Sequence, residues 1–176
     1  MLSNAPLAQP YTVLQPFGAN PSRHRQAATT NQPLLGHEGT DLQAPPGSPV
    51  LAVQSGSVLR TVENHARYGA AILLGHEWGQ SLYANLGQLR VRSGQTVAGG
   101  QEIAVLGGGT ASTPAHLHFG LRIQPFATDD GYMGYSDAAP YLDRLTKGRG
   151  PIIGPHIIGG VEPHLVDADQ LGPVLV

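Results

Sequence analysis

The chain has 176 residues, enough for one domain with a substantial hydrophobic core. Its net charge of −2 and its 12% of charged residues provide no basic surface for a nucleic-acid backbone or an anionic membrane, so no nucleic-acid partner is expected. The absence of cysteine excludes disulfides, thiolate metal sites and cysteine nucleophiles, whereas eight histidines are available as metal ligands.

Glycine and proline set the expected fold class. The chain contains 24 glycines and 15 prolines without a collagen-like period, a composition typical of short strands joined by many turns. No segment approaches the roughly 20 apolar residues of a membrane span, so no transmembrane segment is expected. The first residues, Met1 to Pro6, lack the basic end and the apolar run of a signal peptide.

The first part of the chain is predicted to contain little regular structure. Residues 1–14 form an N-terminal lead-in, unstructured over residues 1–10 and β-like over 11–14. Residues 18–36 are polar, contain Pro21 and Pro33 and show no period, so they are predicted to form a long loop, a kind of segment that is usually functional. His24 in this loop and His65 in a later loop are predicted to be solvated surface histidines.

From Val50 onward the pattern predicts one strand after another. The expected strands cover residues 50–53, 57–62, 70–74, 81–86, 102–106 and 117–123, with a hairpin around residues 76–79. One short helix is expected within residues 136–145. Residues 147–176 contain glycine, proline and aliphatic residues without alternation, and are predicted to be an extended tail. The alternative for this tail is a segment that docks on a protein partner.

Two histidine arrangements are candidates for chemistry: His37 with Asp41, and His116 with His118. Residues two apart in a strand point to the same face, so His116 and His118 would share one space. Taken alone, each pattern also fits a surface turn or hydrogen-bonded strand histidines. Together, two histidines and one carboxylate suit Zn²⁺ and leave a fourth position open for water, as in a catalytic site.

The whole region from about Gln15 to Leu145 resembles the lysostaphin/LytM-type zinc metallopeptidases. The resemblance is carried by five segments in order: Gly36–Leu42, Ala44–Val50, Ala52–Val58, the glycine-turn region Val91–Val97 with Gly100–Ala104, and Pro114–Gly120. It implies an all-β fold, an antiparallel β-sheet or sandwich with a groove of the duplicated-hybrid-motif type, with one short C-terminal helix. It also implies that residues 15–146 form the metallopeptidase-like domain.

Carried over by position, the resemblance implies that His37, Asp41 and His118 bind zinc. His116 is then the general base, which takes a proton from the zinc water and passes it to the leaving amine. The family usually has a second catalytic histidine where this chain has Asn85, in the segment Tyr83 to Leu86. Asn85 can donate a hydrogen bond toward an oxyanion but cannot shuttle a proton.

Contacts between substrate and the side chains of Asn20 and Tyr83 are also expected. The predicted function is zinc-dependent hydrolysis of peptide cross-links in bacterial peptidoglycan. Because of Asn85, the alternative is a degenerate domain that binds wall peptide or activates a protein partner through the tail. The predicted location is extracellular, periplasmic or in a phage particle.

Overall fold

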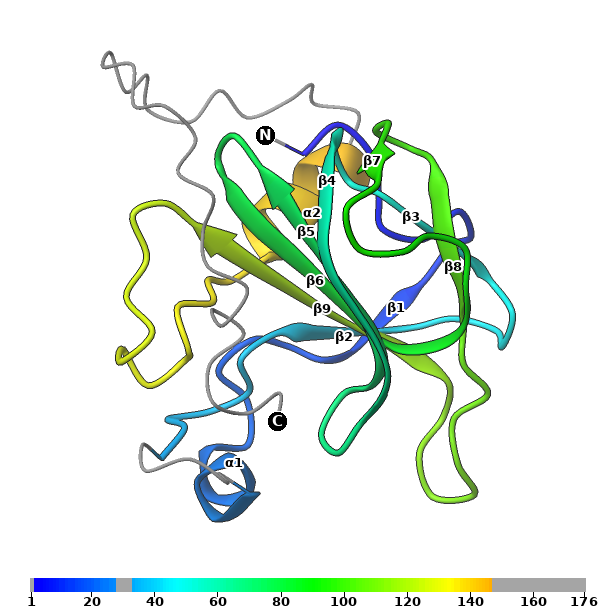
Figure 1. The fold of residues 1–176 in the computed structure, drawn as a ribbon. Helices are drawn as coiled ribbons and strands as arrows, with labels where there is room; N and C mark the ends of the chain where they lie inside the picture. Colours follow the sequence, from blue (N-terminus) through cyan, green and yellow to red (C-terminus); the bar gives the residue numbers. More distant parts are fainter. Residues whose placement is uncertain (1, 28–32, 147–176) are drawn as a thin grey trace.

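Antiparallel strands dominate the computed structural model, which describes residues 2–27 and 33–146 (Figure 1). The strands are Thr12–Gln15 (β1), Thr40–Gln43 (β2), Pro49–Leu51 (β3), Gly56–His65 (β4), Gly69–His76 (β5), Gly79–Leu89 (β6), Thr96–Val97 (β7), Glu102–Leu106 (β8) and His116–Ile123 (β9). The helices are Pro21–Ala27 (α1) and Ala139–Thr146 (α2). The tail predicted over residues 147–176 lies outside the described residues.

The strands form one sheet in the order β1-β2-β9-β6-β5-β4-β7, and β8 pairs with both β6 and β3. All the pairs are antiparallel, which confirms the predicted all-β antiparallel class. Both ends of the order are short strands. At one end, β1 has four residues and a register shift after Val13, and at the other end β7 has two residues.

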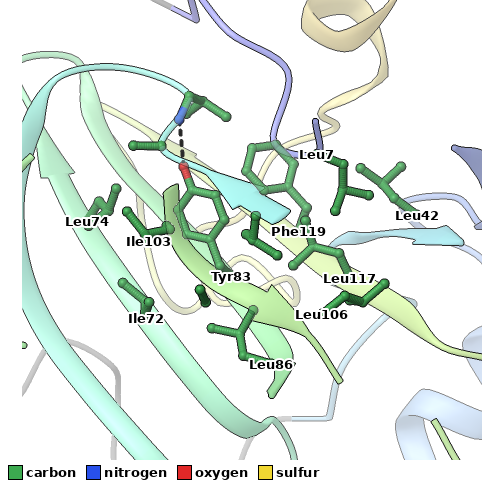
Figure 2. Close-up of a cluster of buried hydrophobic side chains, with 14 of the residues drawn as sticks. Leu7, Leu42, Ile72, Leu74, Tyr83, Leu86, Ile103, Leu106, Leu117 and Phe119 are labelled. Carbon is green, nitrogen blue, oxygen red and sulfur yellow. Dashed lines mark hydrogen bonds between the residues drawn. The ribbon is translucent and has the colours of Figure 1, made fainter. Parts of the chain in front are cut away.

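The main core lies against one face of the sheet (Figure 2). Strand alternation sends Leu42 of β2, Tyr83 of β6 and Leu117 and Phe119 of β9 into this core, where all are fully buried. Ala138 and Leu142 of the α2 region complete the core. The helix confirms the one expected within residues 136–145. The Asp137 carboxylate caps this helix by accepting a hydrogen bond from its first backbone NH, that of Ala139, at 2.9 Å.

The N-terminal segment also belongs to this core, contrary to the expectation that residues 1–10 are unstructured. Leu2 and Leu7 are buried in the core cluster, and Leu7 forms an isolated antiparallel bridge with Val50. This bridge joins residues that are far apart in the sequence and is not part of a regular strand. The sequence around Leu7 therefore shows no alternation from which it could be predicted. The burial of two leucines nevertheless fixes the segment to the domain.

The predicted loop over residues 18–36 contains the helix α1, so the prediction of a structureless segment there was wrong. Pro21 is the first residue of α1, a position where proline costs nothing because its missing NH would have no partner. The carbonyl of Asn20 accepts the backbone NH groups of Arg23 and His24 at 3.1 and 3.2 Å. The helix has seven residues, too few for the apolar period that reveals helices in a sequence.

A smaller buried cluster covers part of the opposite face of the sheet. Its members are Tyr68, Ala71, Leu73, Leu82, Ala84 and Tyr135. The predicted metal ligands lie on this second face, beside Ala84, which pairs with His118. No helix among the described residues is long and apolar enough to cross a membrane.

Candidate metal centre

Strands β2 and β9 bring two predicted metal ligands and the predicted base to one face of the sheet. Asp41 pairs with His118 across these strands, and His116 lies two residues before His118. Side chains two residues apart in a strand share a face, so all three point to the same side. Leu42 and Leu117, which alternate with them, are fully buried in the core on the other side.

His37 reaches the site from the segment before β2. Its backbone NH donates to the carbonyl of Ala19 at 2.9 Å, and its own carbonyl accepts from the NH of Gly18 at 2.8 Å. Gly36 makes this approach possible, because a Cβ there would lie 2.5 Å from the Gly18 carbonyl oxygen. Nδ1 of His37 donates to the carbonyl of Pro16 at 3.2 Å, which leaves Nε2 directed at the other ligands.

Three donor atoms converge at this point. Nε2 of His37 lies 3.1 Å from Nδ1 of His118 and 3.2 Å from Oδ1 of Asp41, and the latter two atoms are 3.0 Å apart. Tetrahedral zinc with bonds of about 2.1 Å places neighbouring ligand atoms about 3.4 Å apart. All three residues are buried, so the donor triangle fits a zinc ion with little movement and leaves a fourth position for another ligand.

The electrostatics of the donor triangle also suit a cation. Burial opposes the negative charge of Asp41, but hydrogen bonds from His118 and His37 and their charges outweigh it and hold the pKa of Asp41 well below its usual range. Burial also opposes the protonation of His37, yet the hydrogen bond to Asp41 and its negative charge raise the pKa of His37. One ionised carboxylate thus draws positive charge into a buried space.

His116 is held beside the donor triangle by two hydrogen bonds. Its Nδ1 donates to the carbonyl of Pro114 at 2.8 Å, because a carbonyl can only accept. Its Nε2 accepts from the Asn85 amide nitrogen, also at 2.8 Å. These partners describe a neutral ring with its proton on Nδ1. Nε2 lies 3.8 Å from Oδ2 of Asp41, so the basic nitrogen is close to the donor triangle.

Asn85 reaches His116 because β6 is irregular at this point. The pairing of β5 with β6 shifts register here, and Asn85 has a φ of 61°. Asparagine adopts this left-handed conformation more readily than most residues do. The backbone NH of Asn85 donates to Tyr68 O at 2.9 Å, and its carbonyl accepts from Gly107 NH at 3.0 Å. These contacts fix the irregularity that turns the amide side chain toward His116.

The structure places the two predicted substrate contacts differently. Tyr83 is fully buried on the core face, where its hydroxyl accepts hydrogen bonds from Val53 NH at 2.9 Å and from the Ser81 hydroxyl at 3.2 Å. The prediction that Tyr83 contacts substrate is therefore wrong, because the alternation of β6 sends its side chain away from the site. Asn20 is exposed at the start of α1, and its contact with substrate stays a prediction.

A buried cluster that no sequence motif predicted lies beside the donor triangle. Glu38 is 1% exposed, and its carboxylate accepts two hydrogen bonds from Arg67, at 2.9 and 2.8 Å, and one from the Tyr68 hydroxyl at 2.9 Å. Burial opposes its ionisation, but the charges of His118 and Arg67 and the Arg67 hydrogen bonds lower the pKa of Glu38 to about 2. In the sequence, Glu38 directly follows His37, and this was the available indication that Glu38 lies near the site. No motif connects the β4–β5 turn, with Arg67 and Tyr68, to the site.

His24 and His65 are not the solvated histidines that were predicted. His24 lies in α1 with its ring centre 5.2 Å from that of His37, and only 13% of its side chain is exposed. His65 is buried, and its Nδ1 accepts from the backbone NH groups of Arg67 and Tyr68 at 3.2 and 3.0 Å. Both histidines lie near the site because segments that are distant in the sequence come together there.

The comparisons agree with the geometry. The family model described as Peptidase family M23 matches residues 35–130, a range that contains the donor triangle, Asn85 and His116. The peptidoglycan DD-endopeptidase ShyB of Vibrio cholerae is 32% identical over 108 residues, which cover 61% of this chain and 24% of ShyB. The chain spans between 20% and 38% of the length of other curated relatives.

Solved structures show the same fold. The catalytic domain of the antimicrobial peptidase lysostaphin from Staphylococcus simulans aligns with a TM-score of 0.59 and 26% identity, covering 76% of this chain and 92% of that domain. A zinc containing peptidase from Vibrio cholerae aligns with a TM-score of 0.59 and 27% identity, covering 78% of this chain and 39% of that protein. The similarity extends over most of the described residues.

Proposed function

Because the chain belongs to peptidase family M23, we propose that it is a zinc-dependent endopeptidase that hydrolyses peptide cross-links of bacterial peptidoglycan. The observation that carries the proposal is the buried donor triangle of His37, Asp41 and His118 with the basic nitrogen of His116 beside it. The name of ShyB, a peptidoglycan DD-endopeptidase, supports the substrate, and the zinc containing peptidase of similar fold supports the metal.

The donor triangle would hold the ion through Nε2 of His37, Nδ1 of His118 and Oδ1 of Asp41. A zinc ion in such a site lowers the pKa of water toward 7 and polarises a carbonyl, so an amide can be hydrolysed without a protein nucleophile. The chain has no cysteine that could act as a nucleophile instead. The outer nitrogen of His37 donates to Pro16, which fixes the orientation of that ligand.

His116 is the proposed general base. Its proton sits on Nδ1, held by Pro114, so Nε2 can accept a proton from the attacking water and return it to the leaving amine. The bond to the Pro114 carbonyl also stabilises the ring once it is positively charged.

Asn85 changes partner during this cycle. In the resting geometry its amide donates to Nε2 of His116. Nε2 has one lone pair, so the amide must leave it before this nitrogen can take a proton from the water. The released amide is then free to donate toward the developing oxyanion. Such a donor contributes about 10²–10³ in rate.

The substrate determines where the protein would act. Peptidoglycan lies outside the cytoplasmic membrane, so the proposed location is extracellular, periplasmic or in a phage particle. Some of the relatives are lipoproteins by name, which supports this location. The proposed partner is the wall peptide itself, and a protein partner through residues 147–176 stays a prediction.

The deciding experiment measures zinc content and the clearing of purified peptidoglycan for the parent chain and for His37→Ala. We expect the parent to carry stoichiometric zinc and to clear the suspension in a chelator-sensitive way, and we expect His37→Ala to lose both. His76→Ala is the matched control, because His76 pairs with Gly79 at the start of β6, well before Asn85, and contacts Ser81 rather than the donor triangle.

The possible results separate clearly. Full zinc and full clearing in His37→Ala would refute the assigned site. Zinc without clearing on several wall types would instead favour the alternative of a domain that does not cut the wall peptide. A parent chain without zinc would contradict the metal assignment altogether.

A further inference from the structure

Glu38 has no role in the proposed mechanism, yet its carboxylate is buried and fully hydrogen-bonded. Its carboxylate is buried, receives both hydrogen bonds of an Arg67 fork and one from the Tyr68 hydroxyl, and therefore cannot turn toward solvent. A fully buried carboxylate is costly unless such partners hold it. The chain thus places one fixed negative charge directly behind the donor triangle.

Besides Tyr68, two histidine rings lie close to this charge: His24, with Nδ1 3.8 Å from Oε2 of Glu38, and the proposed metal ligand His118. Nε2 of His118 lies 3.9 Å from Oε1 of Glu38, too far for a direct hydrogen bond but close enough for a strong electrostatic effect in a buried space. The same Nε2 is buried and has no hydrogen-bond partner among the described residues. Tyr68 stacks on the ring with centres 5.4 Å apart, so the ring is held in this orientation.

The free nitrogen of His118 matters because a histidine binds a metal through one nitrogen and carries its proton on the other. In the donor triangle the ligand atom is Nδ1, so the proton must be on Nε2. A buried NH without a partner is destabilised, and this would favour the wrong tautomer. A negative charge on the Nε2 side reverses that preference.

We propose that Glu38, fixed by Arg67 and Tyr68, is a positioning residue for His118: its carboxylate stabilises the proton on Nε2 and so keeps the lone pair of Nδ1 directed at the metal. This inference rests on the proposed zinc site. It assigns to the β4–β5 turn, through Arg67, an effect on metal affinity, although neither residue of the pair belongs to the donor triangle.

The test measures the zinc dissociation constant of the full chain by competition with a chelator. Glu38→Gln alone leaves the half-buried charge of Arg67 without its partner and endangers folding. The main variant is therefore Glu38→Gln with Arg67→Gln, which removes both charges and keeps hydrogen-bonding groups. We expect the dissociation constant to rise about 10- to 100-fold, the usual effect of losing an outer partner of a metal-bound histidine.

A second readout separates positioning from support of the fold. Bound zinc fixes the tautomer of His118, so ring nitrogen NMR is done on the metal-free chains. The Nε2-protonated tautomer of His118 should be more populated in the parent than in the double variant. The matched control is Arg90→Gln with Glu102→Gln, an exposed ion pair at 3.3 Å, for which we expect neither change.

The outcomes distinguish this inference from the function on which it rests. A double variant with parental zinc affinity, or one that is less stable but keeps the parental tautomer population of His118, would overturn the role of Glu38 and leave the zinc site intact. A parent chain that binds no zinc would overturn both. Weaker zinc binding with a smaller Nε2-protonated population of His118 and an unaffected control would establish the role.

Discussion

At the scale of single residues, the hydrogen-bond partners of His116 define its chemistry. The Pro114 carbonyl accepts from one ring nitrogen and the Asn85 amide donates to the other, so both positions of the ring are assigned. Once the Asn85 amide leaves Nε2, the ring can take up a proton there without turning, because Pro114 holds the other nitrogen. The proposed base differs in this from the proposed metal ligands, whose donor atoms lie within about 3.2 Å of one another.

His116→Gln should therefore abolish most of the hydrolysis and spare the metal. We expect the rate of peptidoglycan clearing to fall by about 10²–10⁴, the usual contribution of a general base. Zinc content, measured by atomic absorption on the same samples, should stay at the parental level. Loss of zinc together with activity would instead make His116 a metal ligand.

Replacing Asn85 by alanine or histidine tests its role as a donor. Asn85→Ala should slow clearing by about 10²–10³ at unchanged zinc content, because one hydrogen bond to the oxyanion is lost. Asn85→His should accelerate clearing by about 10- to 100-fold, because a charged ring donates a stronger hydrogen bond. Histidine also tolerates the left-handed backbone at this position. A parental rate in Asn85→His, combined with tight binding of wall peptide, would favour a binding domain over an enzyme.

At the scale of strands and helices, the site depends on how closely β2 approaches β9. Gly39 lies directly before β2, and the His118 ring occupies the space over it. A Cβ on Gly39 would lie 2.6 Å from Cε1 of His118 and 2.9 Å from the carbonyl oxygen of Phe119. Neither neighbour can retreat, since one is a buried ring and the other is backbone. The absence of a side chain at Gly39 is therefore a condition for the geometry of the donor triangle.

Gly39→Ala should displace the His118 ring and weaken zinc binding. Overpacking of this kind costs about 1–3 kcal/mol, which should appear as a lower melting temperature of the metal-free chain. Gly108→Ala is the control, because a Cβ there would meet nothing within 4 Å. Unchanged zinc affinity in Gly39→Ala would show that the ring has room to move.

The same scale explains which elements the sequence could predict. The strand β8 and the β5–β6 hairpin were predicted because period-two alternation and glycine turns are local features. The helix α1 and the bridge from Leu7 to Val50 were not, since the first is too short to show a period and the second depends on a distant partner. In the site, too, local patterns were predictable and contacts between distant segments were not. Strand spacing and the family resemblance predicted the three ligands, whereas no motif predicted that Arg67 reaches Glu38.

At the scale of the whole molecule, buried charge couples stability to pH. The pKa of Glu38 is lowered from 4.5 in an unfolded chain to about 2 in the folded one. A lowered carboxylate pKa contributes stability that is fully present above the unfolded value and is lost as the pH falls through the folded value. Asp41 shifts in the same direction, so both carboxylates act together in acid.

The metal-free chain should therefore lose melting temperature between about pH 4.5 and pH 2. Thermal unfolding followed by circular dichroism across this range measures the effect. The variant Glu38→Gln with Arg67→Gln should show a smaller decrease over the same interval, because one of the two carboxylates no longer titrates. An identical decrease would assign the acid sensitivity to other groups.

Zinc should also stabilise the molecule as a whole. The proposed ligands His37 and His118 are 81 positions apart in the chain, so an ion bound by both would join distant segments. At free zinc about a hundredfold above its dissociation constant, binding adds about 2.7 kcal/mol, or roughly 5–10 °C in melting temperature. Unfolding scans with added zinc and with chelator measure this difference, and equal melting temperatures would contradict specific binding to the folded state.

The short strands at both ends of the sheet have a consequence for self-association. A long, regular edge exposes a row of unpaired amides on which another chain can add a strand. Here β7 has two residues, and β1 has four with a register shift beside the exposed Val13 and is followed by Pro16. Edges of this kind give a second copy little backbone to extend. Strand addition onto β1 or β7 is thus disfavoured when many copies are concentrated on one surface.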